Sequence, residues 1–314
     1  MRPGPEGQRV DGSALPILNA VHGRAVRPPG NRSLRALSPF GPLVESGWLS
    51  QHLRDKDLRV IDFRWYLDGR SGRAAYDSGH IPGAVFVDLD AHVTGHDSGA
   101  GRHPLPGRSQ FQQSMRCAGV RPESRVVVYD DLGGFSAARL WWLLRYFGHP
   151  AVALLDGGLQ AWGGELSTKP ETAVEGDFVA AAEQLQMKLD YAEVRSLGAR
   201  LVLLDARAPE RFRGEIEPID PRAGHIPGAR SRPWPANLDQ HRRFLSPEAL
   251  RQGFEELGVR SGPEAVAYCG SGVSACHNVL ALEIAGLRGA RLYPGSWSDW
   301  STRPEAPAAT GAGG

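Results

Sequence analysis

The chain has 314 residues, of which 41% are hydrophobic, and a formal net charge of +1 at pH 7. A nearly neutral chain lacks the strongly basic surface that nucleic acid or an anionic membrane would attract, so neither partner is expected. No apolar run reaches the roughly 18 residues that a membrane-spanning helix needs. The length exceeds that of one average domain and suits two.

The cysteine content is low. Cys117, Cys269 and Cys276 are too few for a disulfide framework, and they form no Cys-x-x-Cys or Cys/His metal motif. Free thiols are typical of a reducing compartment, so a cytoplasmic protein without a metal site is expected. Residues 1–40 are rich in glycine, proline and arginine and are predicted to be a disordered extension. A transit peptide is the alternative, although the prolines argue against the amphipathic helix that it needs.

Four motifs occur twice in the same order, with the copies 138 to 145 residues apart. They are VIDFR and LLDAR (60–64 and 203–207), HIPGA (80–84 and 225–229), VVVYD and AVAYC (126–130 and 265–269), and LLDGGLQAW and RLYPGSWSDW (154–162 and 291–300). Ordered repetition at one spacing indicates a duplicated domain. We therefore predict two domains, 41–165 and 186–302, a linker over 166–185, and a disordered tail over 303–314.

Both copies show the same order of predicted elements. The first copy is predicted to contain strands at 58–63, 85–89, 125–129 and 151–155, with helices at 109–118 and 136–147. The second is predicted to contain strands at 200–205, 264–268 and 290–293 and helices at 247–257 and 274–286, while its counterpart of 85–89 is less clear. This alternation indicates an α/β fold in which each domain has a mostly parallel sheet flanked by helices. Sites in such folds form beyond the carboxyl ends of strands.

Cys269 lies at such a strand end and begins the glycine-rich loop CGSGVSA (269–275). Glycines let successive backbone N–H groups point at one centre, and the following helix adds the positive end of its dipole. Both effects favour a thiolate, which is the nucleophilic form of cysteine. The loop residues predicted to cradle a persulfide or an anion are Gly270, Gly272, Val273, Ser274 and Ala275.

The alternative for any single cysteine is a buried packing residue. We predict that role for Cys117 and Cys276, which fall within predicted helices. The first copy has Asp130 at the position of Cys269. Only the second domain is therefore expected to be catalytic.

The HIPGA turns, the DFR and DAR strand ends, the Cys269 loop and the YPGSWSDW segment together resemble the tandem-domain rhodanese family of sulfurtransferases. The resemblance covers about 41–302 and implies two rhodanese-like domains. It also implies that Cys269 takes a sulfane sulfur from a small donor as a persulfide. The sulfur then passes to cyanide, a small thiol or a reduced redox protein, without a metal or an organic cofactor.

The resemblance also bears on the donor. Family members that prefer thiosulfate resemble Cys-Arg-Lys-Gly, whereas those that prefer 3-mercaptopyruvate resemble the Cys-Gly-Ser-Gly present here. In the second group, Ser271 would polarise the donor or move a proton. Arg211 matches the arginine that pairs with the donor carboxylate, and arginine suits that role because it binds carboxylates bidentately. Arg222 is the candidate for a second such arginine, two residues beyond the family position. Thiosulfate remains an alternative donor.

The 3-mercaptopyruvate branch further implies a serine–histidine–aspartate relay. Ser271 matches its serine and His80, in the first HIPGA, matches its histidine. The acidic member is unclear, because Ser71 stands near its position and Asp68 lies three residues earlier. Since the same histidine recurs as His225 in the second HIPGA, a structural role in the turn is the alternative.

Two other functions are compatible with a loop cysteine. Cysteine phosphatases of similar fold use a Cys-x5-Arg motif, but the arginine position is occupied here by Ala275. A non-catalytic sulfur carrier would keep Cys269 and deliver its sulfur only to a dedicated protein. The arginine at position 211 and the intact loop argue against the carrier.

Overall fold

The structure is a computed structural model that describes Met1 and residues 40–96, 101–196 and 201–312. The predicted N-terminal extension, apart from its first and last residues, lies outside the described residues. Within the described ranges, no helix combines the length and the apolar character needed to cross a membrane.

Two parallel sheets form the framework, as predicted. The first has the strand order β1-β5-β4-β2-β3, and the second has the order β7-β6-β8-β9. The strands of the first sheet are β1 (Leu43–Val44), β2 (Leu58–Asp62), β3 (Val85–Phe86), β4 (Arg125–Tyr129) and β5 (Val152–Leu155). Those of the second are β6 (Val202–Asp205), β7 (Arg230–Ser231), β8 (Ala265–Tyr268) and β9 (Arg291–Leu292). β7 is the counterpart of β3 that the sequence indicated less clearly.

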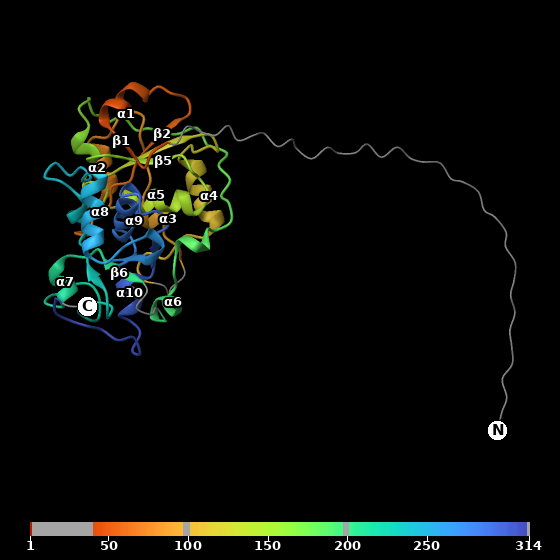
Figure 1. Cartoon of the computed structure of the whole chain (residues 1–314). Coiled ribbons are helices and arrows are strands. Elements are labelled where there is room, and N and C mark those ends of the chain that lie inside the picture. The colour runs from red at the N-terminus through yellow and green to blue at the C-terminus, as the bar shows by residue number, and fades with distance from the viewer. Residues whose placement is uncertain (2–39, 97–100, 197–200, 313–314) are drawn as a thin grey trace. The chain divides into compact units, whose positions relative to one another are not determined.

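Helices connect these strands in both domains (Figure 1). They are α1 (Ser46–His52), α2 (Gly72–Ser78), α3 (Leu89–Val93), α4 (Arg108–Cys117), α5 (Ala137–Tyr146), α6 (Tyr191–Arg195), α7 (Pro209–Arg213), α8 (Pro247–Glu256), α9 (Ala275–Ile284) and α10 (Ser296–Trp300). The start of α8 follows from local chemistry. Ser246 accepts a hydrogen bond from the Ala249 N–H, and Pro247 occupies the first helical position, where no N–H is needed.

The helices α5 and α9 join the two domains. They pack against each other, and one continuous apolar core contains residues of both. α9 is apolar almost all round, as expected for a helix buried on every side. Arg145 of α5 forms an ion pair with Glu283 of α9. Since α9 begins at the Cys269 loop, this packing brings the loop against the first domain.

Each domain repeats one buried ion pair at the end of a central strand. Arg64 binds Asp62 and Arg207 binds Asp205, each with N–O distances down to 2.7 Å. Each guanidinium also donates to the carbonyl of the residue before the HIPGA histidine. The repeated DFR and DAR motifs therefore stabilise the fold of each domain.

The segment 303–312 differs from the predicted disordered tail. Ala309 exchanges two backbone hydrogen bonds with His225, at 2.8 and 2.9 Å, and Ala306 is buried. Arg222 donates to backbone carbonyls of this part of the chain. The segment is ordered because these contacts satisfy its backbone groups, which its small and polar residues do not reveal.

Candidate active site

Cys269 follows β8 directly and is buried, with 2% of its surface exposed. Its Sγ accepts a hydrogen bond from the Gly272 N–H at 3.1 Å, and α9 begins six residues later at Ala275. Gly272 has a φ of 79°, and a Cβ there would lie 2.4 Å from the Pro294 carbonyl oxygen. Only glycine fits this turn, which aims a backbone donor and the start of a helix at the sulfur. The Cys269 sulfur is thus held against a backbone donor at the start of a helix.

A second segment holds the loop backbone in place. The Ser296 Oγ accepts from the Cys269 N–H at 3.1 Å, while the Trp297 N–H donates to the Cys269 carbonyl at 2.9 Å. The Ser298 N–H donates to the Gly270 carbonyl at 2.8 Å. Ser296 has a φ of 54°, a conformation that non-glycine residues rarely adopt and that clusters at functional sites. These contacts explain why the GSWSDW motif accompanies the cysteine.

The remaining loop residues are also enclosed. Val273 and Ala275 are buried, and Ser274, directly before α9, is 7% exposed. Cys276 is buried on α9, where burial raises the pKa of its thiol to about 12, so it is a packing residue as predicted. Cys117 is exposed at the end of α4, so its predicted packing role is wrong.

A serine–histidine–aspartate chain is present, but with a different histidine and aspartate from those predicted. The Ser271 Oγ lies 2.7 Å from His103 Nδ1, and His103 Nε2 lies 3.1 Å from the Asp90 Oδ1. Burial lowers the pKa of His103 to about 4, so its ring is neutral near pH 7. With Nε2–H donating to Asp90, Nδ1 is the acceptor for the Ser271 hydroxyl. Trp65 also donates to Asp90, at 2.9 Å.

The predicted relay members His80 and Asp68 lie elsewhere. His80 is fully buried, its Nδ1 bonds the Tyr76 carbonyl at 2.9 Å, and its ring stacks on that of Tyr76. His225 makes the equivalent contacts with Phe212 in the second domain. Both histidines therefore stabilise their turns, which was the alternative interpretation. Asp68 is exposed and pairs with Arg70 on the surface.

The sequence contained one signal for His103. The stretch GRHPLP, residues 101–106, belongs to none of the four repeated motifs. Residues repeated in both domains, such as His80, serve the common fold, whereas a site that exists once needs residues that occur once. The buried Arg139 of α5 reinforces the geometry by donating to the carbonyls of His103 and Gly272, at 3.0 and 3.2 Å.

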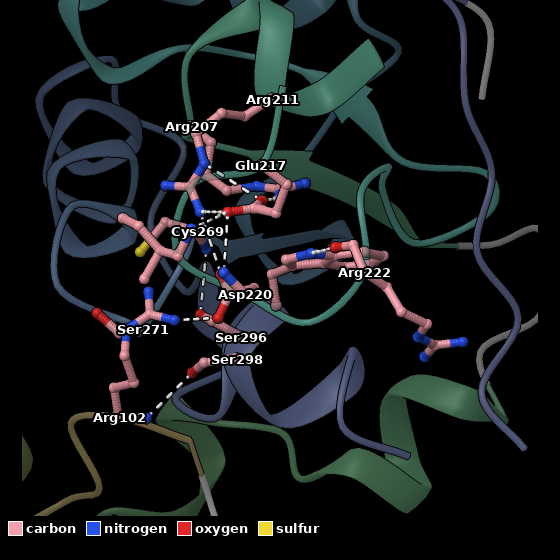
Figure 2. A network of polar contacts seen from close by, with 12 residues as sticks. Arg102, Arg207, Arg211, Glu217, Asp220, Arg222, Cys269, Ser271, Ser296 and Ser298 are labelled. Atoms are coloured by element: carbon pink, nitrogen blue, oxygen red, sulfur yellow. Dashed lines mark hydrogen bonds and ion pairs between the residues drawn. The ribbon is translucent and has the colours of Figure 1, made fainter. Parts of the chain in front are cut away.

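Arg211 lies beside the Cys269 loop, within a cluster of charges (Figure 2). Its Nη2 pairs with Glu217 at 2.6 Å and with Asp220 at 3.1 Å. The other Asp220 oxygen pairs with Arg102, which comes from the first domain. Burial raises the pKa of Asp220, against the opposing charge of Arg102. The sequence analysis missed Arg102, Glu217 and Asp220.

The second predicted carboxylate-binding arginine, Arg222, does not face the loop. Its guanidinium points away from Cys269 in Figure 2 and donates to four backbone carbonyls. These belong to Trp300, Ser301, Arg303 and Ala306. The two-residue shift that the sequence showed therefore places Arg222 against the C-terminal segment, where it is structural.

In the first domain, a side chain of the protein itself occupies the equivalent loop. The Asp130 carboxylate accepts hydrogen bonds from the backbone N–H groups of Leu132, Gly134, Ser136 and Ala137, at 2.8 to 2.9 Å. A loop of this kind thus binds an anion through its backbone donors. In the first domain that anion is the protein's own carboxylate.

Comparison with known proteins agrees with this architecture. The family model described as the rhodanese-like domain matches twice, at residues 45–165 and 182–303. The chain belongs to the rhodanese family. A Pseudomonas aeruginosa member, named for 3-mercaptopyruvate sulfurtransferase activity, is 46% identical over 86% of this chain and 98% of its own length. A Mycobacterium tuberculosis member, SseB, named for thiosulfate sulfurtransferase activity, is 42% identical over 81% of this chain and 91% of its own length.

A solved rhodanese structure gives the same result. The crystal structure of SseA from Escherichia coli, described as a 3-mercaptopyruvate sulfotransferase, superposes with a TM-score of 0.73 and 34% sequence identity. The match covers 82% of this chain and 99% of SseA. The present chain is therefore a sulfurtransferase with two rhodanese domains. Its candidate site is shared between them, with Cys269, Ser271 and Arg211 from the second and Asp90, Arg102 and His103 from the first.

Proposed function

We propose that this sulfurtransferase takes sulfur from 3-mercaptopyruvate and passes it to a thiophilic acceptor through a Cys269 persulfide. The Cys269 thiolate attacks the thiol sulfur of the donor. The new S–S bond forms as the C–S bond breaks, and the bonding pair leaves on the enolate of pyruvate. Arg211 binds the donor carboxylate and keeps the carbon skeleton beside the loop.

The reaction needs proton transfer. The donor carries three hydrogens, two on carbon 3 and one on sulfur, and pyruvate carries all three on its methyl carbon. One proton therefore leaves sulfur and one reaches carbon, and a group beside Cys269 can carry out both transfers. The Ser271 hydroxyl accepts the proton from sulfur as it gives its own to His103, and it then donates a proton to the enolate while His103 returns the proton to the Ser271 oxygen. Asp90 stabilises the charged imidazole in between.

The second half of the reaction restores the enzyme. A thiolate or cyanide attacks the outer sulfur of the persulfide, the S–S bond breaks, and the electron pair returns to Cys269 as a thiolate. The Gly272 N–H and the start of α9 stabilise that leaving group.

The observation that carries the proposal is the 2.7 Å contact of Ser271 with His103 in the loop of the nucleophile. Thiosulfate has no thiol proton to move, so only 3-mercaptopyruvate turnover requires the relay. We expect His103→Gln to lower kcat/KM with 3-mercaptopyruvate by about 100-fold and to leave the thiosulfate reaction nearly unchanged. The assay is thiocyanate release with excess cyanide, and exposed His241→Gln is the matched control. An equal loss with both donors would contradict the relay.

Thiosulfate is the second candidate donor, because the guanidinium groups of Arg102 and Arg211 beside the loop suit a dianion. A wild-type kcat/KM that favours thiosulfate would support it. A sulfur carrier would instead load one sulfur on Cys269 and show no turnover with either donor. Under any of the three, Cys269→Ser should abolish persulfide formation detected by mass spectrometry, whereas Cys117→Ser should retain it.

A further inference from the structure

The guanidinium of Arg102 reaches the catalytic loop from the other domain. Its backbone N–H donates to the Ser298 Oγ at 3.1 Å, which anchors this part of the first domain on the second. Its side chain then extends to Asp220, beside Cys269 and Ser271 (Figure 2). A Cβ placed on Gly270 would lie 2.8 Å from Arg102 Nη2. Arg102 therefore covers the loop directly.

Arg102 and Arg211 approach the same point. The position of a Cβ on Gly270 is also 3.6 Å from Arg211 Nη1. Asp220 bridges the two guanidiniums through their other nitrogens, Arg102 Nη1 and Arg211 Nη2. Within the described part of the chain, no acceptor is paired with Arg102 Nη2 or Arg211 Nη1. Two donor groups are thus held by Asp220 with their unpaired nitrogens facing the space over Gly270.

The space over Gly270 is bounded by the guanidinium groups of Arg102 and Arg211. Gly270 does not have a positive φ, so its backbone conformation would accept a side chain. A side chain there would displace the guanidinium of Arg102 from its place over the loop. A small group bound over Gly270 would meet two cationic donors, beside the nucleophile and the Ser271 hydroxyl.

We infer that Arg102 binds the carboxylate of the sulfur donor together with Arg211, so that the first domain supplies a substrate-binding residue of the site. Two guanidiniums that converge on one point suit a carboxylate, whose two oxygens accept from both. Arg102 thereby takes the part that the sequence analysis assigned to Arg222. This inference rests on the proposed function for the identity of the donor.

The test compares a donor with a carboxylate and one without it. Mercaptoacetone has a methyl group in place of the carboxylate of 3-mercaptopyruvate. We expect Arg102→Met to lower kcat/KM for 3-mercaptopyruvate on the order of 30-fold and that for mercaptoacetone less than threefold. Arg102→Lys should show an intermediate loss, because it keeps the charge but not the fork of donors. Arg73→Met, which removes an exposed arginine of α2, is the control.

A binding measurement separates this inference from the proposed function. The dissociation constant of pyruvate, measured by titration calorimetry, should rise about 10- to 100-fold in Arg102→Met and stay unchanged in Arg73→Met. An unchanged affinity for pyruvate, or equal losses with both donors, would overturn the role of Arg102. If the wild-type protein does not turn over 3-mercaptopyruvate, the proposed function is wrong. The role of Arg102 is then decided only by comparing the pyruvate affinities of the wild type and Arg102→Met. Melting temperatures confirm that each variant is folded.

Discussion

His277 predicts a specific loss of stability at acid pH. It lies on the first turn of α9 and is fully buried between the domains. Its Nε2 lies 3.1 Å from the Gly133 carbonyl, to which only an N–H can donate. Its Nδ1 lies 3.2 Å from Asn237 Nδ2, whose orientation is fixed because Asn237 Nδ2 also donates to Asn278 and its Oδ1 accepts from Arg232. Nδ1 is therefore an acceptor, and a second proton would face another N–H.

The magnitude follows from the pKa of His277. Burial, aided by the charge of Arg232, lowers that pKa from 6.5 to about 4, against the hydrogen bond to Gly133. Between these values the unfolded chain binds more protons than the folded one, so stability is complete above about pH 6.5 and falls as the pH decreases. The contribution of this residue is a loss of about 2 kcal/mol between pH 7.5 and 5, approaching about 3 kcal/mol near pH 4.

Urea unfolding at pH 7.5 and pH 5.0 measures this loss. His103, whose pKa is also lowered by burial, adds to the total decrease in the wild-type protein. The comparison is therefore made with His277→Gln, whose decrease between the two pH values should be smaller than that of the wild type by about 2 kcal/mol. His241→Gln, at an exposed position, should show the wild-type decrease. If wild type and His277→Gln lose the same stability, the assignment of a neutral buried His277 is refuted.

Three further substitutions test residues that hold the two loops and the C-terminal segment in place. Gly272→Ala should lower kcat more than 100-fold, because the Cβ of the alanine would clash with the Pro294 carbonyl oxygen. Full activity would show that the turn does not need glycine. Arg222→Met should lower the unfolding free energy by about 2–4 kcal/mol, since four backbone carbonyls lose a charged hydrogen-bond donor. The same variant should leave KM for the sulfur donor within twofold. A large rise in KM would show that Arg222 binds the substrate after all. Asp130→Ala should lower the melting temperature by unpairing four N–H groups, and an unchanged value would contradict this role of Asp130 in its loop.

The sequence by itself determined the duplicated domain and the parallel sheets, and it placed the proposed nucleophile, Cys269, at the end of a strand. These depend on local patterns, since short apolar runs between glycine turns predict strands wherever they occur. The placement of Cys269 at a strand end before a helix is of the same kind. The sequence also singled out Arg211, because the stretch around it matches the family motif that contains the carboxylate-binding arginine.

The roles predicted from family motifs were wrong for residues that stabilise the fold. The HIPGA histidine is present in both copies, and in both its ring stacks on an aromatic residue and bonds a backbone carbonyl. Because this histidine also occurs in the domain whose loop has no cysteine, its role in the turn is enough to explain it. Arg222 was misassigned for a related reason, since a shift of two residues in a loop turned its side chain toward the C-terminal segment.

Only the tertiary structure decided which residues complete the site. Ser271 and His103 are 168 positions apart, and Arg102 and Asp220 are 118 apart. Their contacts depend on how α5 and α9 pack the domains together, and no local periodicity encodes which loop of one domain will face the other. Asp90, Arg102 and His103 of the candidate site therefore come from the domain that has no thiol in its own loop, because the Cys269 loop packs against that domain.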